Sequence, residues 1–338
     1  MPRRRSLASI HGMTPLLDVR NLRVTYHSRA VDRWQALAHI TFQLQAGETL
    51  GVLGESGSGK STLAAALLRF LPANAQVHGE VFFEGQELVR APSRGLQNIR
   101  GRRVAAVFQE PLLGLHPMFR ISEQVSDVLS AHDSLSRKER RDKTLQLLSK
   151  VFPADSERIA RSYPHQLSGG QRQRVLIAQA IACGPSLIIA DEPTASLDPT
   201  TQQEILALFR GLRQQLKLSM ILITHNPALL AGFADRILIL YSGHIVEIGP
   251  TERVLAAPQH PYTQALLRCA SALTSSRGEN RKQKLPVVPG DGPNMLVLPP
   301  GCRFEPRCPD RFDLCTKRAP ELIATSADHG VSCFKYGG

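Results

Sequence analysis

Apolar and polar residues alternate over 17–25 and again over 40–44. A period of two is typical of β-strands that bury one face. A turn at 46–48 then leads into a mostly apolar run at 49–53, which predicts a short buried strand. The chain is therefore expected to begin with strands.

Three later apolar runs have strand length and are separated by stretches with helical patterns. They lie at 187–190, 220–224 and 237–241. Buried strands that alternate with helices are typical of an α/β layer with a parallel sheet. Helices are expected over 61–70, 120–160 and 171–183.

The composition changes after about residue 254. Nine prolines fall between residues 258 and 309, and four of the six cysteines cluster between 302 and 333. Proline interrupts helices and inner strands, so long elements are not expected here. We predict a boundary near residue 254 and a small irregular extension over 254–338.

Charge and composition narrow the function classes. The chain of 338 residues has a formal net charge of +12, but its Lys and Arg residues are scattered and aromatics make up only 5%. A nucleic-acid platform would interleave basic and aromatic side chains, so no nucleic-acid partner is expected. No apolar run approaches the ~20 residues that span a bilayer, and no apolar segment of a signal peptide follows the basic start. We expect a cytoplasmic protein whose positive charge suits the inner face of a membrane.

Residues 54–61 read Gly-Glu-Ser-Gly-Ser-Gly-Lys-Ser and fit the phosphate-loop pattern G-x-x-x-x-G-K-[ST]. The glycines let the backbone curl so that successive N–H groups point at phosphates, and the following helix adds its positive N-terminal end. Lys60 can reach the β- and γ-phosphates, and the Ser61 hydroxyl can ligate Mg²⁺. An accidental glycine-rich turn is the alternative, but the strand before the loop and the helix after it favour a nucleotide site. The predicted nucleotide-binding residues here are Gly54, Glu55, Ser56, Gly57, Ser58, Gly59, Lys60, Ser61 and Thr62.

Two further segments suit the same chemistry. Asp191 and Glu192 end an apolar strand, where Asp191 can hold Mg²⁺ through water and Glu192 can orient or deprotonate an attacking water. Ser168, Gly169 and Gly170 precede a helical pattern and offer N–H donors and a hydroxyl to an anion. Each of these segments is common when it stands alone, so it indicates a nucleotide site only in combination with the others.

The motifs, in their order along the chain, resemble those of the ATP-binding cassette (ABC) family of transport ATPases. Leu167-Ser168-Gly169-Gly170-Gln171 matches the family signature without a substitution, and Phe108-Gln109-Glu110-Pro111 matches its Q-loop. The D-loop is matched by Ser196-Leu197-Asp198, and the switch histidine by His225. Tyr26 stands where the family places an aromatic residue that stacks on adenine.

The resemblance covers about residues 15–253 and implies a fold. It implies an α/β P-loop NTPase cassette with a mixed β-sheet, an antiparallel β-subdomain and an inserted helical subdomain at about 110–180. Residues 1–14 would then form a basic N-terminal tail.

The resemblance also implies roles. Glu192, His225 and Gln109 would be catalytic, and Ser61, Gln109 and Asp191 would hold Mg²⁺. The signature residues Ser168, Gly169, Gly170 and Gln171, with Asp198 of the D-loop, would contact ATP bound to the opposite subunit of a head-to-tail dimer.

The stretch 163–174, with Tyr163-Pro164-His165-Gln166 before the signature, looks like the oligopeptide, dipeptide and nickel uptake subfamily. The stretch 260–267 and the segments around Cys302 and Cys308 resemble its C-terminal extension. The resemblance implies two membrane permeases, an extracytoplasmic binding protein and a second ATPase, identical or paralogous. Peptide is the favoured cargo, with nickel or another small solute as the alternative. Gly114-Leu115-His116-Pro117 and Asn226 depart from the subfamily's usual residues at the permease-facing surface and after the switch histidine.

Four cysteines suggest a metal centre. Cys302, Cys308, Cys315 and Cys333 have the spacing C-x5-C-x6-C-x17-C. Disulfides are not expected in a reducing cytoplasm, and four thiolates suit zinc or an iron–sulfur cluster. The tight C-x2-C pairs of many zinc sites are absent, which favours a [4Fe–4S] cluster over zinc, and unligated thiols are the remaining alternative.

Two other function classes compete with a transport ATPase. A soluble cassette ATPase that acts on DNA or ribosomes usually has two cassettes or a long coiled-coil insertion, and this sequence has neither. A cassette that binds ATP without hydrolysis is disfavoured by Lys60, Gln109, Glu192 and His225 together.

Overall fold

The computed structural model describes residues 14–27, 33–109, 114–275, 287–292 and 298–337. The basic tail expected at residues 1–14 lies outside this part except for Thr14. The chain divides into two compact units. Unit 1 consists of Met1–Gln45, Thr49–Val89 and Thr224–Gly338, and unit 2 consists of Ala46–Glu48 and Arg90–Ile223.

Unit 1 contains the antiparallel sheet implied by the resemblance, with the strand order β2-β1-β4-β5. The alternation in β1 changes phase between Val19 and Leu22, where the register shifts and Asn21 has a φ of 49°. This β-bulge keeps the apolar side chains on both sides of it buried. The strands are β1 (Leu17–Tyr26), β2 (Trp34–Leu44), β4 (Ala75–Phe83) and β5 (Gln86–Glu87).

A second run of strands in unit 1 carries the phosphate loop. The central strand β3 (Thr49–Leu53) pairs in parallel with β9 (Arg236–Tyr241), and β10 (His244–Pro250) pairs antiparallel with β9. The helix α1 (Lys60–Leu67) follows β3. It ends at Leu67, whereas the sequence pattern predicted a helix over 61–70. Parallel and antiparallel pairs together make this sheet mixed.

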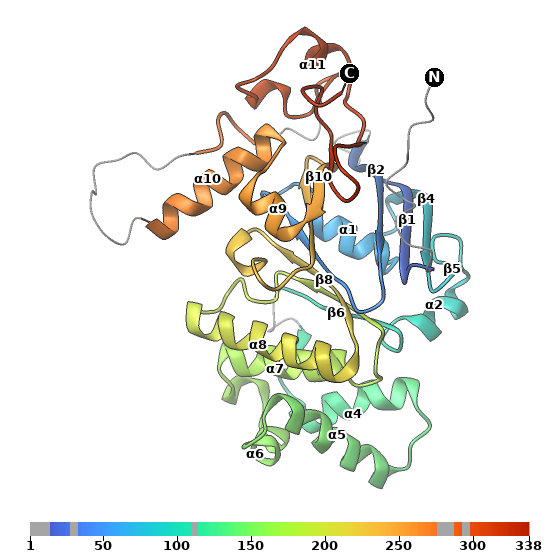
Figure 1. Ribbon diagram of the computed structural model, residues 1–338. Helices are drawn as coiled ribbons and strands as arrows, with labels where there is room; N and C mark the ends of the chain where they lie inside the picture. Colours follow the sequence, from blue (N-terminus) through green and yellow to red (C-terminus); the bar gives the residue numbers. More distant parts are fainter. Residues whose placement is uncertain (1–13, 28–32, 110–113, 276–286, 293–297, 338) are drawn as a thin grey trace. The chain divides into compact units, whose positions relative to one another are not determined.

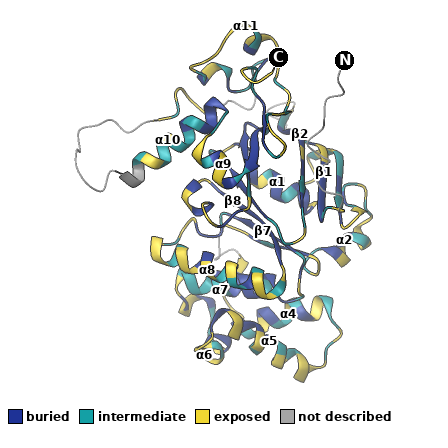
Figure 2. Ribbon diagram, in the orientation of Figure 1, coloured by how far each residue is buried: buried dark blue, intermediate teal, exposed yellow. Residues whose placement is uncertain are grey.

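Unit 2 contains parallel strands and a group of helices. β7 (Leu187–Asp191) pairs in parallel with β6 (Val104–Val107) and with β8 (Ser219–Thr224). Both β7 and β8 are buried, dark blue in Figure 2. Such continuous burial is typical of strands covered on both faces.

The helices of unit 2 pack mainly on one another. α4 (Ile121–His132), α5 (Arg137–Val151) and α6 (Ser156–Arg161) lie beside one another, and α4 and α5 also contact α7 (Gly169–Ala180) (Figure 1). Leu129, Leu148 and Val151 are fully buried, as the apolar pattern of this segment predicts. The helices are α2 (Ser93–Ile99), α4 (Ile121–His132), α5 (Arg137–Val151), α6 (Ser156–Arg161), α7 (Gly169–Ala180) and α8 (Pro199–Leu216), with the 3₁₀ turn η1 (Pro164–Gln166).

The extension is more regular than its prolines suggest. Pro261 occupies the first position of α10 (Pro261–Ser275), where a missing N–H costs nothing, and no proline follows inside the helix. Near the chain end, β12 (Gly330–Val331) pairs with β10. The expectation of no long element was therefore wrong for α10. The remaining elements are η2 (Pro227–Leu229), α9 (Thr251–Ala256), η3 (Glu305–Arg307), α11 (Asp313–Lys317) and β11 (Ile323–Ala324).

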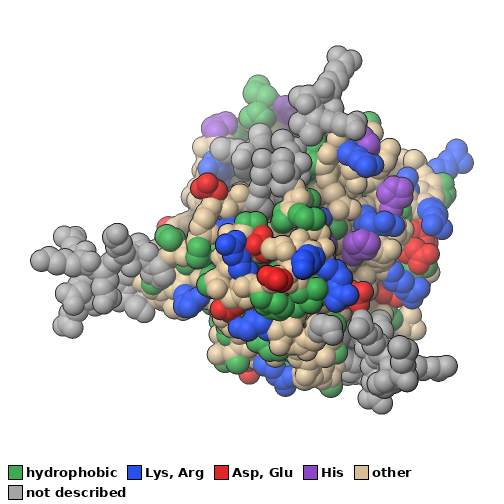
Figure 3. Space-filling view, turned by 90° about the horizontal axis from the view of Figure 1, so that it is seen from above, with side chains coloured by type: hydrophobic (Ala, Val, Ile, Leu, Met, Phe, Trp, Pro, Cys, Tyr) green, Lys and Arg blue, Asp and Glu red, His purple; other side chains and the backbone are tan. Residues whose placement is uncertain are grey.

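The surface agrees with a scattered positive charge. In Figure 3, Lys and Arg side chains are spread among acidic, polar and apolar ones and form no continuous patch on the face that is drawn. Within the described parts of the chain, no helix has both the length and the apolar character needed to cross a membrane.

Candidate functional site

The phosphate loop joins β3 to α1 in unit 1. Gly57 and Gly59 have φ values of 77° and 104°, which suit glycine and strain other residues. A Cβ on Gly57 would meet open space, but one on Gly59 would lie 2.9 Å from the carbonyl oxygen of Ala36. The loop is thus curled by glycine conformations and open at Gly57, as a cradle for phosphate requires.

The lysine of this loop is turned inward. Lys60 is buried, and its Nζ donates hydrogen bonds to the carbonyl oxygens of Gly54 and Glu55, each at 2.8 Å. Ser58 is buried as well, and its Oγ has no hydrogen-bond partner within the described part of the chain. A buried ammonium group beside a curled backbone fits a polyanion.

An aromatic pair lies close to the start of α1. Tyr26, the last residue of β1, stacks on Trp34 with ring centroids 5.1 Å apart and an interplanar angle of 25°. Its hydroxyl also donates to the Thr62 Oγ1 at 3.5 Å. Two stacked rings at this place provide a flat apolar face suited to a planar base.

In unit 2, the end of β7 brings three predicted residues together. Asp191 is the buried last residue of this strand, and Glu192 follows with a φ of 48°. A left-handed conformation at a residue other than glycine costs about 1–3 kcal/mol and is often found at functional sites. The Gln109 Nε2 donates to the Glu192 Oε2 at 3.4 Å. Glu110 and Pro111 lie outside the described residues.

The signature segment forms the N-terminus of α7. The Ser168 Oγ accepts a hydrogen bond from the Gln171 N–H at 3.2 Å, and the Gln171 Oε1 accepts one from the Ser168 N–H at 3.0 Å. This reciprocal pair is a capping box. Ser168 is exposed, so the capped end of the helix is accessible.

The predicted D-loop caps the next helix and meets the signature. Asp198 accepts hydrogen bonds from the Thr201 Oγ1 at 2.6 Å and from the Thr201 N–H at 3.0 Å, which lower the pKa of Asp198. The Thr201 methyl carbon would lie 2.5 Å from a Cβ on Gly170. Gly170 is therefore required by the close approach of α7 and α8.

His225 is exposed and follows β8 directly. The next residue, Asn226, caps η2, since its Oδ1 accepts a hydrogen bond from the Ala228 N–H at 3.0 Å. Asn226 therefore fits this position, where the subfamily commonly has Asp, because its side chain forms this local hydrogen bond.

The predicted site residues fall into two groups. Unit 1 holds Tyr26, the phosphate loop and His225, whereas unit 2 holds Gln109, Asp191, Glu192, the signature and Asp198. Within unit 1, Tyr26 is joined to the loop helix. Within unit 2, Gln109 is joined to Glu192, and the signature to the D-loop.

Sequence reasoning missed two residues of the extension that contact the phosphate loop. The Tyr262 hydroxyl accepts a hydrogen bond from the Glu55 N–H at 2.9 Å. The Arg307 guanidinium forms a two-pronged ion pair with the Glu55 carboxylate at 2.8 and 3.2 Å. Both lie in segments recognised only by resemblance, and no pattern in the sequence links them to the loop.

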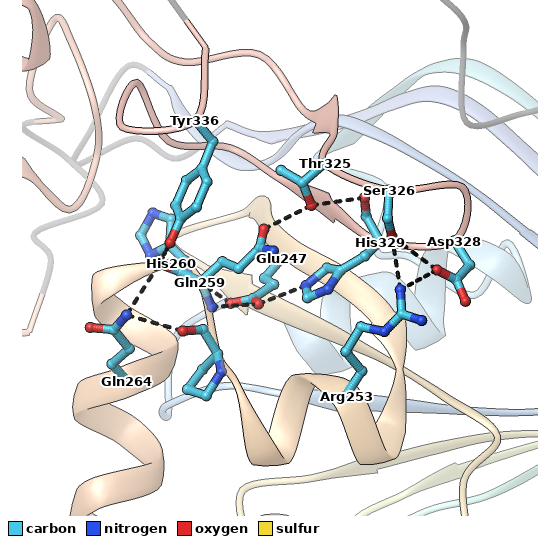
Figure 4. A network of polar contacts seen from close by, with 11 residues as sticks. Glu247, Arg253, Gln259, His260, Gln264, Thr325, Ser326, Asp328, His329 and Tyr336 are labelled. Atoms are coloured by element: carbon cyan, nitrogen blue, oxygen red, sulfur yellow. Dashed lines mark hydrogen bonds and ion pairs between the residues drawn. The ribbon is translucent and has the colours of Figure 1, made fainter.

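A buried polar network fastens the extension to β10. The fully buried Glu247 carboxylate bonds to the His329 Nε2 at 2.8 Å and accepts hydrogen bonds from the backbone N–H groups of Gln259 and His260 (Figure 4). At its edge, Arg253 pairs with Asp328 at 2.5 Å. A buried carboxylate needs such partners, so this network fixes where the extension lies in unit 1.

The four clustered cysteines line one cavity, together with aromatic residues such as Phe304. Burial and repulsion from the other thiolates raise the pKa of Cys302 to about 12. However, no group of His, Cys, Asp and Glu side chains in the described ranges is arranged to hold a metal ion. The metal centre expected at Cys302, Cys308, Cys315 and Cys333 therefore has no support from this arrangement.

Comparisons with known proteins agree with these motifs. The profile of the ABC transporter family matches residues 37–195, and that of the oligopeptide/dipeptide transporter C-terminal region matches residues 246–315. The oligopeptide transport ATP-binding protein OppD of Salmonella typhimurium is 40% identical over 320 residues, which cover 95% of this chain and 93% of OppD. A putative peptide import ATP-binding protein of Brucella abortus is 42% identical over 313 residues and 92% of each chain.

Solved structures with the same fold are ATP-binding cassettes. The dimeric post-hydrolysis structure of the cassette MJ0796, bound to ADP and Pi, has a TM-score of 0.62 and 31% identity and covers 70% of this chain and 98% of that one. CbiO1 of Clostridium perfringens, part of the transporter complex cbiONQ, has a TM-score of 0.62 and 26% identity over 72% of this chain and 92% of its own. The expected P-loop NTPase cassette is confirmed. The chain therefore belongs to the ABC transporter family, as an ATP-hydrolysing, ATP-binding protein of the oligopeptide/dipeptide branch.

Proposed function

We propose that this ATPase drives the uptake of dipeptides or oligopeptides through partner permeases. The C-terminal region of the oligopeptide/dipeptide branch and the names of the peptide-transporting relatives support this cargo. The chain then acts at the cytoplasmic face of the membrane, with two permeases, an extracytoplasmic binding protein and a second ATPase subunit, identical or paralogous.

The observation that carries the ATPase mechanism is the glycine-curled loop around buried Lys60. In the proposed site, the amides of this loop and the Lys60 ammonium bind the β- and γ-phosphates. Ser61, Gln109 and Asp191 would hold Mg²⁺, which would neutralise phosphate charge. Tyr26 stacks on adenine.

Glu192 is the proposed general base. Its left-handed backbone and its contact with Gln109 support a positioned carboxylate that orients a water for attack on the γ-phosphate. His225, exposed at the end of β8, contacts the γ-phosphate. The bond that breaks joins the γ-phosphorus to the bridging oxygen, and the water proton passes to Glu192.

The signature segment is proposed to act on the partner's nucleotide. Ser168, Gly169, Gly170 and Gln171 lie at an accessible, capped helix N-terminus, which is a ready site for the phosphates of ATP held by another subunit. Asp198 lies close to them, because it accepts a hydrogen bond from Thr201, whose methyl group packs against Gly170. The related cassette MJ0796 was solved as a dimer.

The [4Fe–4S] cluster expected at the four cysteines stays a prediction, and no step of the mechanism depends on it. Iron content and visible absorbance of anaerobically purified protein test it directly.

The test of function uses a strain that lacks this chain. Complementation with the natural chain should restore uptake of labelled dipeptides and oligopeptides. Lys60→Ala should lower both uptake and ATP hydrolysis by about 100-fold, because the phosphates lose the ammonium group that the loop supplies. Lys150→Ala, an exposed lysine on α5, is the matched control. Restored nickel uptake without peptide uptake would refute the peptide assignment.

A further inference from the structure

The C-terminal extension contacts the phosphate loop at Glu55. This contact joins parts of the chain that are 207 and 252 positions apart. All the groups involved lie in unit 1.

The peptide between Gly54 and Glu55 is held at both of its polar groups. Its N–H, which belongs to Glu55, donates to the buried Tyr262 hydroxyl at 2.9 Å, and its carbonyl oxygen, which belongs to Gly54, accepts from the Lys60 Nζ at 2.8 Å. The N–H is therefore committed to the extension and the carbonyl to the phosphate-binding lysine. Any rotation of this peptide would break both hydrogen bonds.

The Glu55 side chain is held by Arg307, whose side chain is only 6% exposed. The two prongs of the guanidinium meet the two carboxylate oxygens, the arrangement that gives Arg–carboxylate pairs their geometric specificity. The Arg307 Nε donates to the carbonyl oxygen of Pro289 at 2.6 Å, so the extension itself orients the guanidinium. The pair is thus preset by the extension and presented to the loop.

Aromatic packing stiffens the same contact. The rings of Tyr241, Tyr262 and Phe304 are mutually packed, with centroids 4.5–5.4 Å apart, and all three are fully buried. Tyr241 belongs to β9 of the cassette, whereas the other two belong to the extension. The hydroxyl of Tyr262 is therefore fixed in place before a nucleotide arrives.

We propose that the extension is a positioning element of the nucleotide site, in which Tyr262 and Arg307 hold the first turn of the phosphate loop in its anion-binding conformation. The proposal rests on ATP binding by this loop and is independent of the transported cargo. Neither residue touches the reacting atoms, so both act through Glu55 and Lys60.

Tyr262→Phe tests this with the smallest change, because it deletes one hydroxyl and keeps the ring. Loss of the acceptor leaves the Glu55 N–H without a partner, and the loop then samples other conformations. We expect the Kd for ATP and for ADP of the purified full-length chain to rise about 5–10-fold, with kcat at saturating ATP within about twofold.

The matched control is Tyr336→Phe, which deletes the hydroxyl of another tyrosine of the extension. That hydroxyl donates to the carbonyl oxygen of Gln259 at 3.2 Å, away from Glu55 and Arg307. The control should change the Kd less than twofold. Arg307→Lys should raise the Kd further than Tyr262→Phe, since a single ammonium cannot replace the fork.

Equal Kd values for Tyr262→Phe and Tyr336→Phe would overturn the proposal. So would a fall in kcat at unchanged Kd, which indicates a role in chemistry instead of loop positioning. The failure of the proposed function looks different, because Lys60→Ala would then leave ATP binding intact.

Discussion

Two glycine-rich segments of this chain each begin a helix, and they use glycine for different reasons. In the phosphate loop, Gly57 and Gly59 have positive φ values, so the backbone itself wraps the space for an anion. In the signature, Gly170 lies within α7 and must be small because the Thr201 methyl group occupies the place of a Cβ. One segment has a curled backbone, whereas the other presents a helix end.

The polar contacts of the two segments also differ. The phosphate loop has a buried cation turned onto its own carbonyl oxygens and an outer support from the extension. The signature satisfies its own ends through the capping box of Ser168 and Gln171 and leaves the serine exposed. The proposed site for the chain's own nucleotide is thus supported from outside, whereas the segment proposed to act on the partner's nucleotide is exposed.

The largest expected effect comes from Glu192→Gln. Loss of the proposed base should lower kcat about 1000-fold, within the range of general-base contributions, and leave ATP bound. ATP should then hold two subunits together, which size-exclusion chromatography or small-angle scattering would detect. Glu204→Gln, an exposed partner of Arg174 on α8, is the control and should hydrolyse at the parent rate. Hydrolysis by Glu192→Gln at that same rate would remove Glu192 from the mechanism.

A smaller effect separates the two glycine-rich segments. Gly170→Ala should lower ATP hydrolysis about 10-fold, because the new methyl group displaces Thr201 and with it the Asp198 cap. The Kd of the dilute monomer for ATP should stay within about twofold, since the phosphate loop is untouched. Thr201→Ser removes the obstructing methyl group, keeps the hydroxyl and should restore activity. Weaker ATP binding by the monomer would contradict the division of roles.

The smallest effect concerns the stability of the part that holds the phosphate loop. Burial, followed by the positive charge of Arg303, lowers the pKa of His244 to about 3. As the pH falls below the unfolded pKa of ~6.5, the unfolded chain binds a proton that the folded chain rejects, so stability present near pH 7 is lost. This residue should reduce the free energy of unfolding by about 2 kcal/mol between pH 7 and pH 5. Denaturant titrations should show a shallower pH dependence for His244→Gln, and an unchanged slope would refute the prediction.

Local sequence patterns predicted much of this fold. The alternation in β1, the apolar runs of β7 and β8 and the apolar face of α4 and α5 all predicted buried elements that the structure contains. The patterns work because strand and helix periods are set by the backbone within a few residues. Proline count misled for α10, since a proline at the first helical position is harmless.

The sequence by itself determined the chemistry of the nucleotide motifs, because within each motif the residue types and spacing that suit phosphates or Mg²⁺ are contiguous in the chain. Only the tertiary structure decided what supports the phosphate loop. Tyr262 and Arg307 reach Glu55 from more than 200 positions away, and their roles come from burial and distance. Those quantities arise when the chain folds, so a linear pattern does not contain them.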